Sequence, residues 1–320
     1  PRDHPLRALR RLRGAAMSRG LGARGAAVWL LLAGAVALAA LAARGMHARP
    51  GRQDGGDRLR VVVTVPPQAW LVKRLGGDRV DVDVLLPPGA SEHTYEPTPQ
   101  QVARLADARL MVEVGHPALL FERRLLDAMV IREPTPLVVE MTHGLVLPDS
   151  PAPAPHSHGA DPHVWLSPKV MRSSAVAVAA ALERLDPAGA PLYRANLRAT
   201  LADIDRLDGE LARELSALPD RRFLVYHPAW GYFANDYGLE QVAIETDGKE
   251  PSPRRLVELL EEARRAGTRA VFVQHGEYDR PAQAIAEEIG ARVVALEPLA
   301  EDWPANLRRV AALLREGASG

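Results

Sequence analysis

The sequence predicts an α/β fold made of two Rossmann-like lobes that one long helix joins. From residue 59 onward, short apolar segments alternate with amphipathic helical patterns, and the alternation occurs in two blocks. Such alternation is typical of parallel strands with crossover helices. The stretch between the blocks has helical spacing alone. With 320 residues and 47% hydrophobic residues, the chain is long enough to form two packed cores.

The first block predicts an N-terminal lobe over residues 58–187. Its apolar segments favour strands, because they are short and end at turn-forming residues. We expect strands at 59–65, 80–86, 110–114 and 137–141, and helices at 69–75, 99–106 and 118–129.

The segment after this block predicts the linking helix, over residues 188–218. Apolar residues recur at helical spacing from 191 to 218. Asp186 and Pro187 form a helix start signal, and Pro219 is a stop signal. One helical linker should permit less hinge motion than a pair of flexible strands.

The second block predicts a C-terminal lobe over residues 219–320 with the same kind of alternation. We expect strands at 223–226, 241–244, 270–273 and 293–296, and helices at 253–266, 281–289 and 303–314.

The start of the chain has the pattern of a secretory signal. Met17 is followed by Arg19 and Arg24, then by an uncharged apolar run over residues 26–43, with small residues for cleavage. We assign residues 1–45 to the signal peptide and upstream residues, and 46–57 to a linker. This predicts export to the periplasm; an uncleaved membrane anchor is the alternative, because the run is near the shortest length that spans a bilayer.

Charge and cysteine content exclude several classes of function. Forty basic side chains balance forty acidic ones, so no net positive charge draws the chain to nucleic acid. There are no cysteines, which excludes disulfides, thiolate metal sites and a lipidated cysteine. Any metal site must therefore use histidine and oxygen ligands.

Polar residues gather where predicted strands end. Open parallel sheets bind ligands beyond the carboxyl ends of their strands, so these positions carry functional weight. The residues that follow predicted strands are His93, His116, His227, His275 and Glu297. His163 comes just before a helical pattern that begins near Pro168. Three histidines with a carboxylate or water make a normal zinc site without sulfur.

Four ordered motifs resemble those of the zinc and manganese solute-binding proteins of ABC importers, the cluster A-I or zinc-uptake type. They are GASEHTYEP at 89–97, DPHVWLSP at 161–168, YHPAWGYF at 226–233 and LEPL at 296–299. The resemblance implies a metal site in the cleft between the lobes, with His93, His163 and His227 as ligands. Histidine at the third position implies Zn²⁺ rather than Mn²⁺, consistent with the preference of manganese for oxygen ligands.

The fourth ligand is predicted to be Glu297, where the family commonly has aspartate. Glutamate keeps the carboxylate but adds one methylene, so Glu297 either binds the metal directly or hydrogen-bonds a bound water. His275 is an alternative ligand. The proline-rich segment 148–160, with His156 and His158, is interpreted as an exposed loop that either traps metal weakly or carries incidental histidines.

The resemblance also implies partners: a membrane permease with its ATPase, to which a monomeric, non-catalytic receptor delivers zinc. Two alternatives belong to other classes. A zinc-dependent hydrolase would use an open coordination position to activate water, and an adhesin-like surface protein would hold the metal while it is attached to cells.

Overall fold

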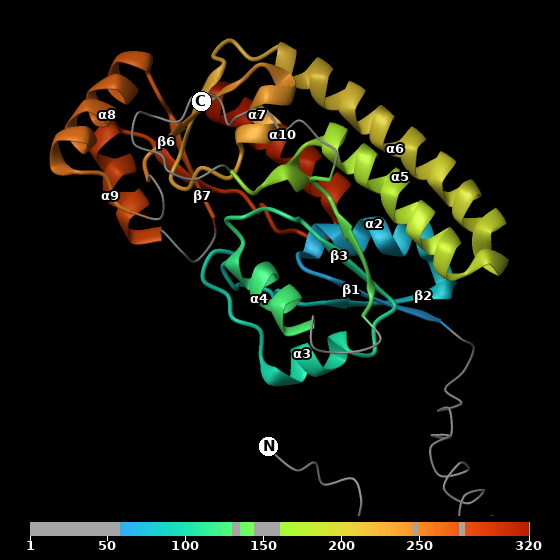
Figure 1. Cartoon of the computed structure of the whole chain (residues 1–320). Helices are drawn as coiled ribbons and strands as arrows, with labels where there is room; N and C mark the ends of the chain where they lie inside the picture. Colours follow the sequence, from blue (N-terminus) through green and yellow to red (C-terminus); the bar gives the residue numbers. More distant parts are fainter. Residues whose placement is uncertain (1–57, 130–134, 144–160, 246–248, 275–278, 320) are drawn as a thin grey trace, which may run out of the picture. The chain divides into compact units, whose positions relative to one another are not determined.

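The computed structural model describes residues 58–129, 135–143, 161–245, 249–274 and 279–319. Residues 57–320 form one compact unit. Within it lie two four-stranded sheets, all of whose neighbouring strands are parallel (Figure 1). The predicted α/β class with two parallel-sheet lobes is thereby confirmed.

The two sheets share one topology. The first contains β1 (Leu59–Val63), β2 (Val80–Val84), β3 (Leu110–Glu113) and β4 (Leu137–Glu140), in the order β2-β1-β3-β4. The second contains β5 (Arg222–Val225), β6 (Glu240–Ala243), β7 (Ala270–Val273) and β8 (Arg292–Ala295), in the order β6-β5-β7-β8. In both sheets the strand order reverses beside the first strand, and this point is where open α/β sheets bind ligands.

Helices connect the strands of each sheet. In the first lobe these are α2 (Pro66–Gly76), α3 (Pro99–Leu105) and α4 (Leu120–Met129), followed by the short η2 turn (Val164–Leu166) and α5 (Pro168–Leu185). In the second they are α7 (Gly231–Tyr237), α8 (Pro253–Ala266), α9 (Asp279–Ile289) and α10 (Trp303–Ser319). The largest differences from expectation are in three helices: α2 begins three residues earlier than 69, α10 ends five residues later than 314, and α7 was not predicted.

The connecting helix is α6 (Ala190–Ser216), 27 residues long. A short 3-10 turn, Pro187–Gly189, precedes it, and the Asp186 side chain caps that turn by accepting a hydrogen bond from the Gly189 amide. The helix packs against α2 and α5 of the first lobe and against α7 and α10 of the second (Figure 1). It therefore contacts both lobes, as its predicted linking role requires.

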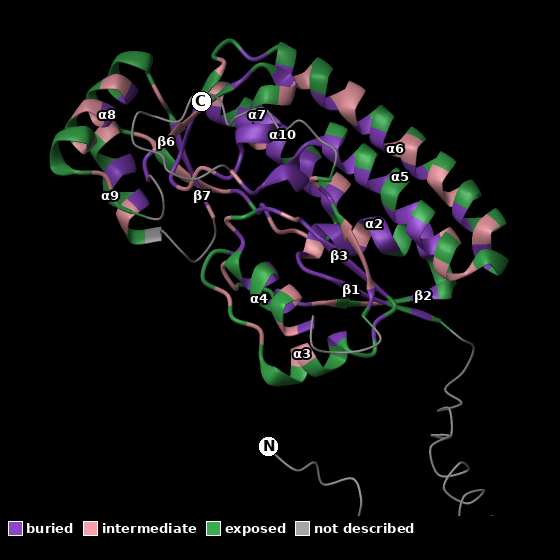
Figure 2. Cartoon of the chain, in the orientation of Figure 1, coloured by how far each residue is buried: buried purple, intermediate pink, exposed green. Residues whose placement is uncertain are grey.

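The main hydrophobic core crosses from one lobe to the other. It includes residues of both sheets and of α2, α5, α6 and α10, where buried positions face the interior (Figure 2). Trp165 and Trp303 are among its largest fully buried side chains. A smaller second cluster lies in the second lobe and includes residues of β5, β7, α8 and α9. One shared core makes the two lobes a continuous packed body rather than two separate ones.

Several expectations lie outside the described residues: the signal segment, the linker 46–57, the loop with His156 and His158, and His275. Among the helices that the structure describes, none has the length and apolar content needed to cross a bilayer. The lobe boundaries at 187 and 218 stay predictions.

A buried carboxylate in β3 should make stability depend on pH. Glu113 is 1% exposed, and its Oε2 atom has no hydrogen-bond partner. Burial, with the nearby charges of Glu122 and Glu140, raises the pKa of Glu113 to about 8. The unfolded chain releases this proton near pH 4.5, whereas the folded chain keeps it until about pH 8. Glu113 therefore leaves the free energy of unfolding undiminished below pH 4.5, and it lowers this free energy progressively as the pH rises towards 8.

We expect Glu113→Gln to remove this loss. Urea unfolding at pH 5 and pH 8.5 measures the free energy of unfolding. At pH 8.5 the variant should exceed the parent by at least about 1 kcal/mol, the free energy of one pKa unit. Asp107→Asn, at an exposed acid in the same lobe, is the matched control and should change neither value. Equal pH dependence in the Glu113 variant and the parent would contradict the assignment.

Candidate metal site

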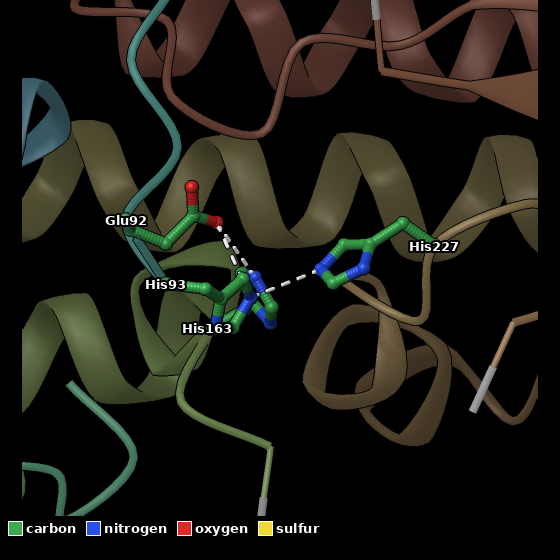
Figure 3. Close-up of side chains that lie close together, drawn as sticks. All are labelled: Glu92, His93, His163 and His227. Carbon is green, nitrogen blue, oxygen red and sulfur yellow. Dashed lines mark hydrogen bonds and ion pairs between the residues drawn. The ribbon is translucent and has the colours of Figure 1, made fainter. Parts of the chain in front are cut away.

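Three histidines predicted from separate parts of the chain come together in the structure. His93 lies in the loop between β2 and α3, His163 immediately precedes the η2 turn, and His227 follows β5 by two residues. With Glu92 they form a group whose ligand atoms all lie within 4.8 Å of one another (Figure 3). The first and second lobes therefore both supply side chains to one cluster.

The Nε2 atoms of the histidines point toward a common centre. The Nε2 atoms of His93 and His227 are 3.2 Å apart, and the His163 Nε2 is 2.9 Å from Glu92 Oε1. Zinc binds imidazole nitrogen at about 2.0–2.1 Å with tetrahedral angles, which separates two ligand nitrogens by about 3.3 Å. The spacing of His93 and His227 thus fits a shared zinc ion.

Buried carboxylates orient two of the rings. Asp161 Oδ1 lies 2.6 Å from the His163 Nδ1, and Glu245 Oε1 lies 3.2 Å from the His227 Nδ1. An ionised carboxylate only accepts hydrogen bonds, so each Nδ1 carries its hydrogen. Each Nε2 is then the nitrogen that can bind metal, an arrangement common in zinc sites.

The charge of the cluster suits a dication. The side chains of Glu92, Asp161 and Glu245 are 1%, 7% and 2% exposed. Burial disfavours the Glu92 carboxylate, but the hydrogen bond and charge of His163 outweigh burial and lower the pKa of Glu92 to about 2. A buried carboxylate that stays ionised beside three histidines favours a cation at the centre.

The pKa values of two histidines move in opposite directions. Burial and the neighbouring His163 lower the pKa of His93 to about 4. Burial also disfavours charge on His163, but Asp161 and Glu92 outweigh burial and raise its pKa to about 9. His163 is thus an imidazolium at neutral pH, with one N–H donated to each carboxylate.

Close packing against the second lobe fixes Asp161. A Cβ atom at Gly231 would lie 2.6 Å from Asp161 Oδ2, so only glycine lets the two segments approach this closely. The Asp161 Oδ1 atom also accepts a hydrogen bond from the His163 backbone amide, at 2.9 Å. Asp161 is therefore held on two sides while it orients His163.

Asp161→Asn should weaken zinc binding about 10- to 100-fold, the usual cost of losing a carboxylate that orients a metal-binding histidine. An amide can accept the Nδ1 hydrogen but supplies no charge to the ring. Asp205→Asn, at an exposed ion pair with Arg172, is the control and should leave affinity unchanged. A competition titration with a zinc chelator measures both; parental affinity in Asp161→Asn would show that this carboxylate does not support the site.

The fourth predicted residue, Glu297, lies outside this cluster. It is exposed, and its backbone carbonyl accepts a hydrogen bond from Asn306 Nδ2 at 2.6 Å. Direct ligation by Glu297 stays a prediction. Glu92, next to His93 in the first motif, is the carboxylate that the structure places in this cluster, 2.9 Å from the His163 Nε2, and it was not among the predicted ligands.

Comparisons with known proteins agree on one family. The model of the ZnuA family, described as zinc-uptake complex component A, periplasmic, matches residues 61–317. The high-affinity zinc uptake system protein ZnuA of Bacillus subtilis is 29% identical over 277 residues, covering 81% of this chain and 84% of that protein.

Solved structures are also similar. A zinc-bound deletion mutant of ZnuA superposes with a TM-score of 0.76 at 39% identity, covering 82% of this chain and 99% of that one. The Zn(II)-bound ZnuA-like domain of Streptococcus pneumoniae AdcA has a TM-score of 0.69 at 26% identity, covering 82% and 100%.

Proposed function

The chain belongs to the ZnuA family of periplasmic zinc-uptake components and is a zinc-binding solute-binding protein, and from this premise we propose that it captures one Zn²⁺ ion with His93, His163, His227 and Glu92. The observation that carries the ligand assignment is the convergence of these side chains from both lobes. The captured ion is the cargo, which the protein delivers to the membrane permease of an ABC importer and its ATPase.

The ligand set favours zinc over manganese. Three imidazole nitrogens and one carboxylate oxygen suit zinc, whereas manganese prefers carboxylate, carbonyl and water oxygens. Competitive titration of the purified chain tests the proposal: calorimetry should show one equivalent of zinc bound, and excess Mn²⁺ should not displace it. Preference for manganese would overturn the zinc assignment.

The same ligand set argues for a receptor rather than a hydrolase. A catalytic zinc keeps an open coordination position for water, whereas four protein ligands fill a tetrahedral shell. The family is a metal-binding transport component. We propose that the chain catalyses no reaction, works as a monomer, and reaches the periplasm through the signal peptide at residues 1–45.

Zinc affinity should fall as the pH falls below about 9. The raised pKa of His163 means that a proton occupies its Nε2 at neutral pH, and zinc must displace this proton. We expect about a tenfold loss of affinity for each pH unit below 9, the slope for one competing proton. His93 adds no competition near neutrality, because its pKa is lowered to about 4.

Calorimetry at pH 7.5 in buffers of different ionisation enthalpy measures this displacement directly. Zinc binding should release about one proton per ion, as the linkage between metal and proton binding requires. An affinity that is constant between pH 8.5 and pH 7, with no proton release, would contradict the imidazolium form of His163.

A further inference from the structure

Two tryptophans bind the lobes to each other directly behind the metal site. Trp165, in the η2 turn of the first lobe, donates its indole N–H to the Pro298 carbonyl after β8, at 2.8 Å. Trp303, at the start of α10 in the second lobe, donates its indole N–H to the Trp165 carbonyl, at 2.7 Å. We name this reciprocal pair of hydrogen bonds, formed by Trp165, Pro298 and Trp303, the tryptophan clasp.

Both tryptophan side chains of the clasp are buried, and each packs against another aromatic ring. Both tryptophans are 0% exposed. The Trp303 ring packs on Trp70 of α2, with ring centroids 5.2 Å apart, and the Trp165 ring meets the His163 ring edge-on at the same centroid distance. One end of the clasp therefore touches a proposed zinc ligand, and the other end anchors the second lobe on the first.

Separation of the lobes would break the clasp at high cost. Two indole N–H groups and two carbonyls would lose their partners, and an unpaired buried polar group is expensive. Two large aromatic surfaces would also lose their packing. The lobe spacing is therefore fixed by contacts that do not involve metal.

The metal cluster depends on that spacing. His93 and His163 belong to the first lobe and His227 to the second, and the Nε2 atoms of His93 and His227 approach within 3.2 Å. If only a fraction of the molecules holds the ligands in the binding arrangement, the apparent affinity is the intrinsic affinity multiplied by that fraction. Metal affinity therefore depends on how firmly the lobes are held before zinc arrives.

We propose that Trp303 and Trp165 are positioning residues that hold the lobes at the spacing that the zinc site needs in the metal-free protein. The proposal deepens the function proposed above and rests on it for the identity of the metal. This role explains why two indole hydrogen bonds join the lobes next to His163. Helix α6 already links the lobes, so these hydrogen bonds are not needed for the connection itself.

The main test is Trp303→Phe in the full chain, with Trp70→Phe as the matched control. Phenylalanine keeps a ring in the core but removes the N–H that reaches Trp165. Trp70 packs on the same Trp303 ring from α2, so its replacement changes the packing and leaves the clasp hydrogen bonds in place. Circular dichroism establishes that both variants fold.

Interlobe distance is the first measurement, made without metal. The chain has no cysteines, so Asp127→Cys in α4 and Glu261→Cys in α8, both exposed positions, accept spin labels cleanly. Trp303→Phe should broaden the distance distribution, and zinc should narrow it again. Trp70→Phe changes the ring packing but keeps both clasp hydrogen bonds, so it should broaden the distribution less than Trp303→Phe does. A distribution as narrow as the parent's in Trp303→Phe overturns the proposal, as does equal broadening in both variants.

Zinc release is the second measurement. Trp303→Phe should release zinc about tenfold faster, the effect of roughly one lost buried hydrogen bond, with a smaller increase in Trp70→Phe. Different measurements test the two proposals. If the parent binds no zinc, the proposed function is wrong. The interlobe distances in the metal-free protein still test the clasp in that case.

A measurement on the parent chain covers the case in which Trp303→Phe does not fold. The five tryptophan indole N–H groups give separate nitrogen-15 signals, and two of them should exchange slowly with solvent in the metal-free protein. Rapid exchange of the Trp165 and Trp303 signals would show that the clasp opens without metal and would overturn the proposal.

Discussion

Replacing His227 by alanine should weaken zinc binding by about two to three orders of magnitude. A zinc site of four ligands contributes roughly 10–16 kcal/mol, or about 3–4 kcal/mol for each ligand. His227 is the cluster's one member from the second lobe, so its loss also removes the bridge between the lobes. Zinc would then be held from one side only.

A competition titration with a zinc chelator measures this loss. His143→Ala is the matched control, because its side chain is 85% exposed, and it should retain parental affinity. The ligand assignment would be wrong if His227→Ala kept an affinity within a few-fold of the parent.

Glu92→Gln should also weaken zinc binding strongly, by about 100-fold, whereas Glu297→Gln should change it less than threefold. Glutamine keeps the shape of glutamate but offers zinc a neutral oxygen, and one ligand is worth roughly 3 kcal/mol of the total. The Glu92 carboxylate lies 2.9 Å from the His163 Nε2 and is 1% exposed, while Glu297 is exposed. The two variants make the same chemical change at the two candidate carboxylates.

The pair of results identifies the fourth ligand. Glu297→Gln should keep the parent's thermal stability without zinc to within about 1 kcal/mol, the range of ordinary surface substitutions. Glu92→Gln should lower that stability by more, because it removes one buried carboxylate partner of His163. A large loss in Glu297→Gln with none in Glu92→Gln would support the original prediction of Glu297 and refute the assignment of Glu92.

The sequence was sufficient for the fold because its apolar pattern is regular. All eight strands begin at or within one residue of the predicted start. Helix α7 was missed because its sequence, Gly231–Tyr237, is aromatic and short. Its one clear signal is Gly238, which ends the helix in the left-handed conformation at φ 63°.

The candidate site was predictable only in part. The histidines were found from motifs, because their long spacings alone carry little information. Glu92 was overlooked because a carboxylate next to a ligand histidine often points away from it; only the fold turns it inward. Glu245 had a usable signal, since it follows β6 at the carboxyl edge of the second sheet. Asp161 stands two residues before His163, close enough to reach its Nδ1.

The clasp had no signal in the sequence. Trp165 and Trp303 are 138 residues apart. Their relation depends on how the η2 turn meets the loop after β8, which is a matter of tertiary packing. Local patterns carry no information about such a contact.

A zinc-edge anomalous difference map of crystals grown with one equivalent of zinc locates the bound ion. We expect one dominant peak between the lobes, about 2.0–2.2 Å from the Nε2 atoms of His93, His163 and His227 and from a Glu92 oxygen. A dominant peak elsewhere, or one bound by histidines of a single lobe, would contradict this expectation.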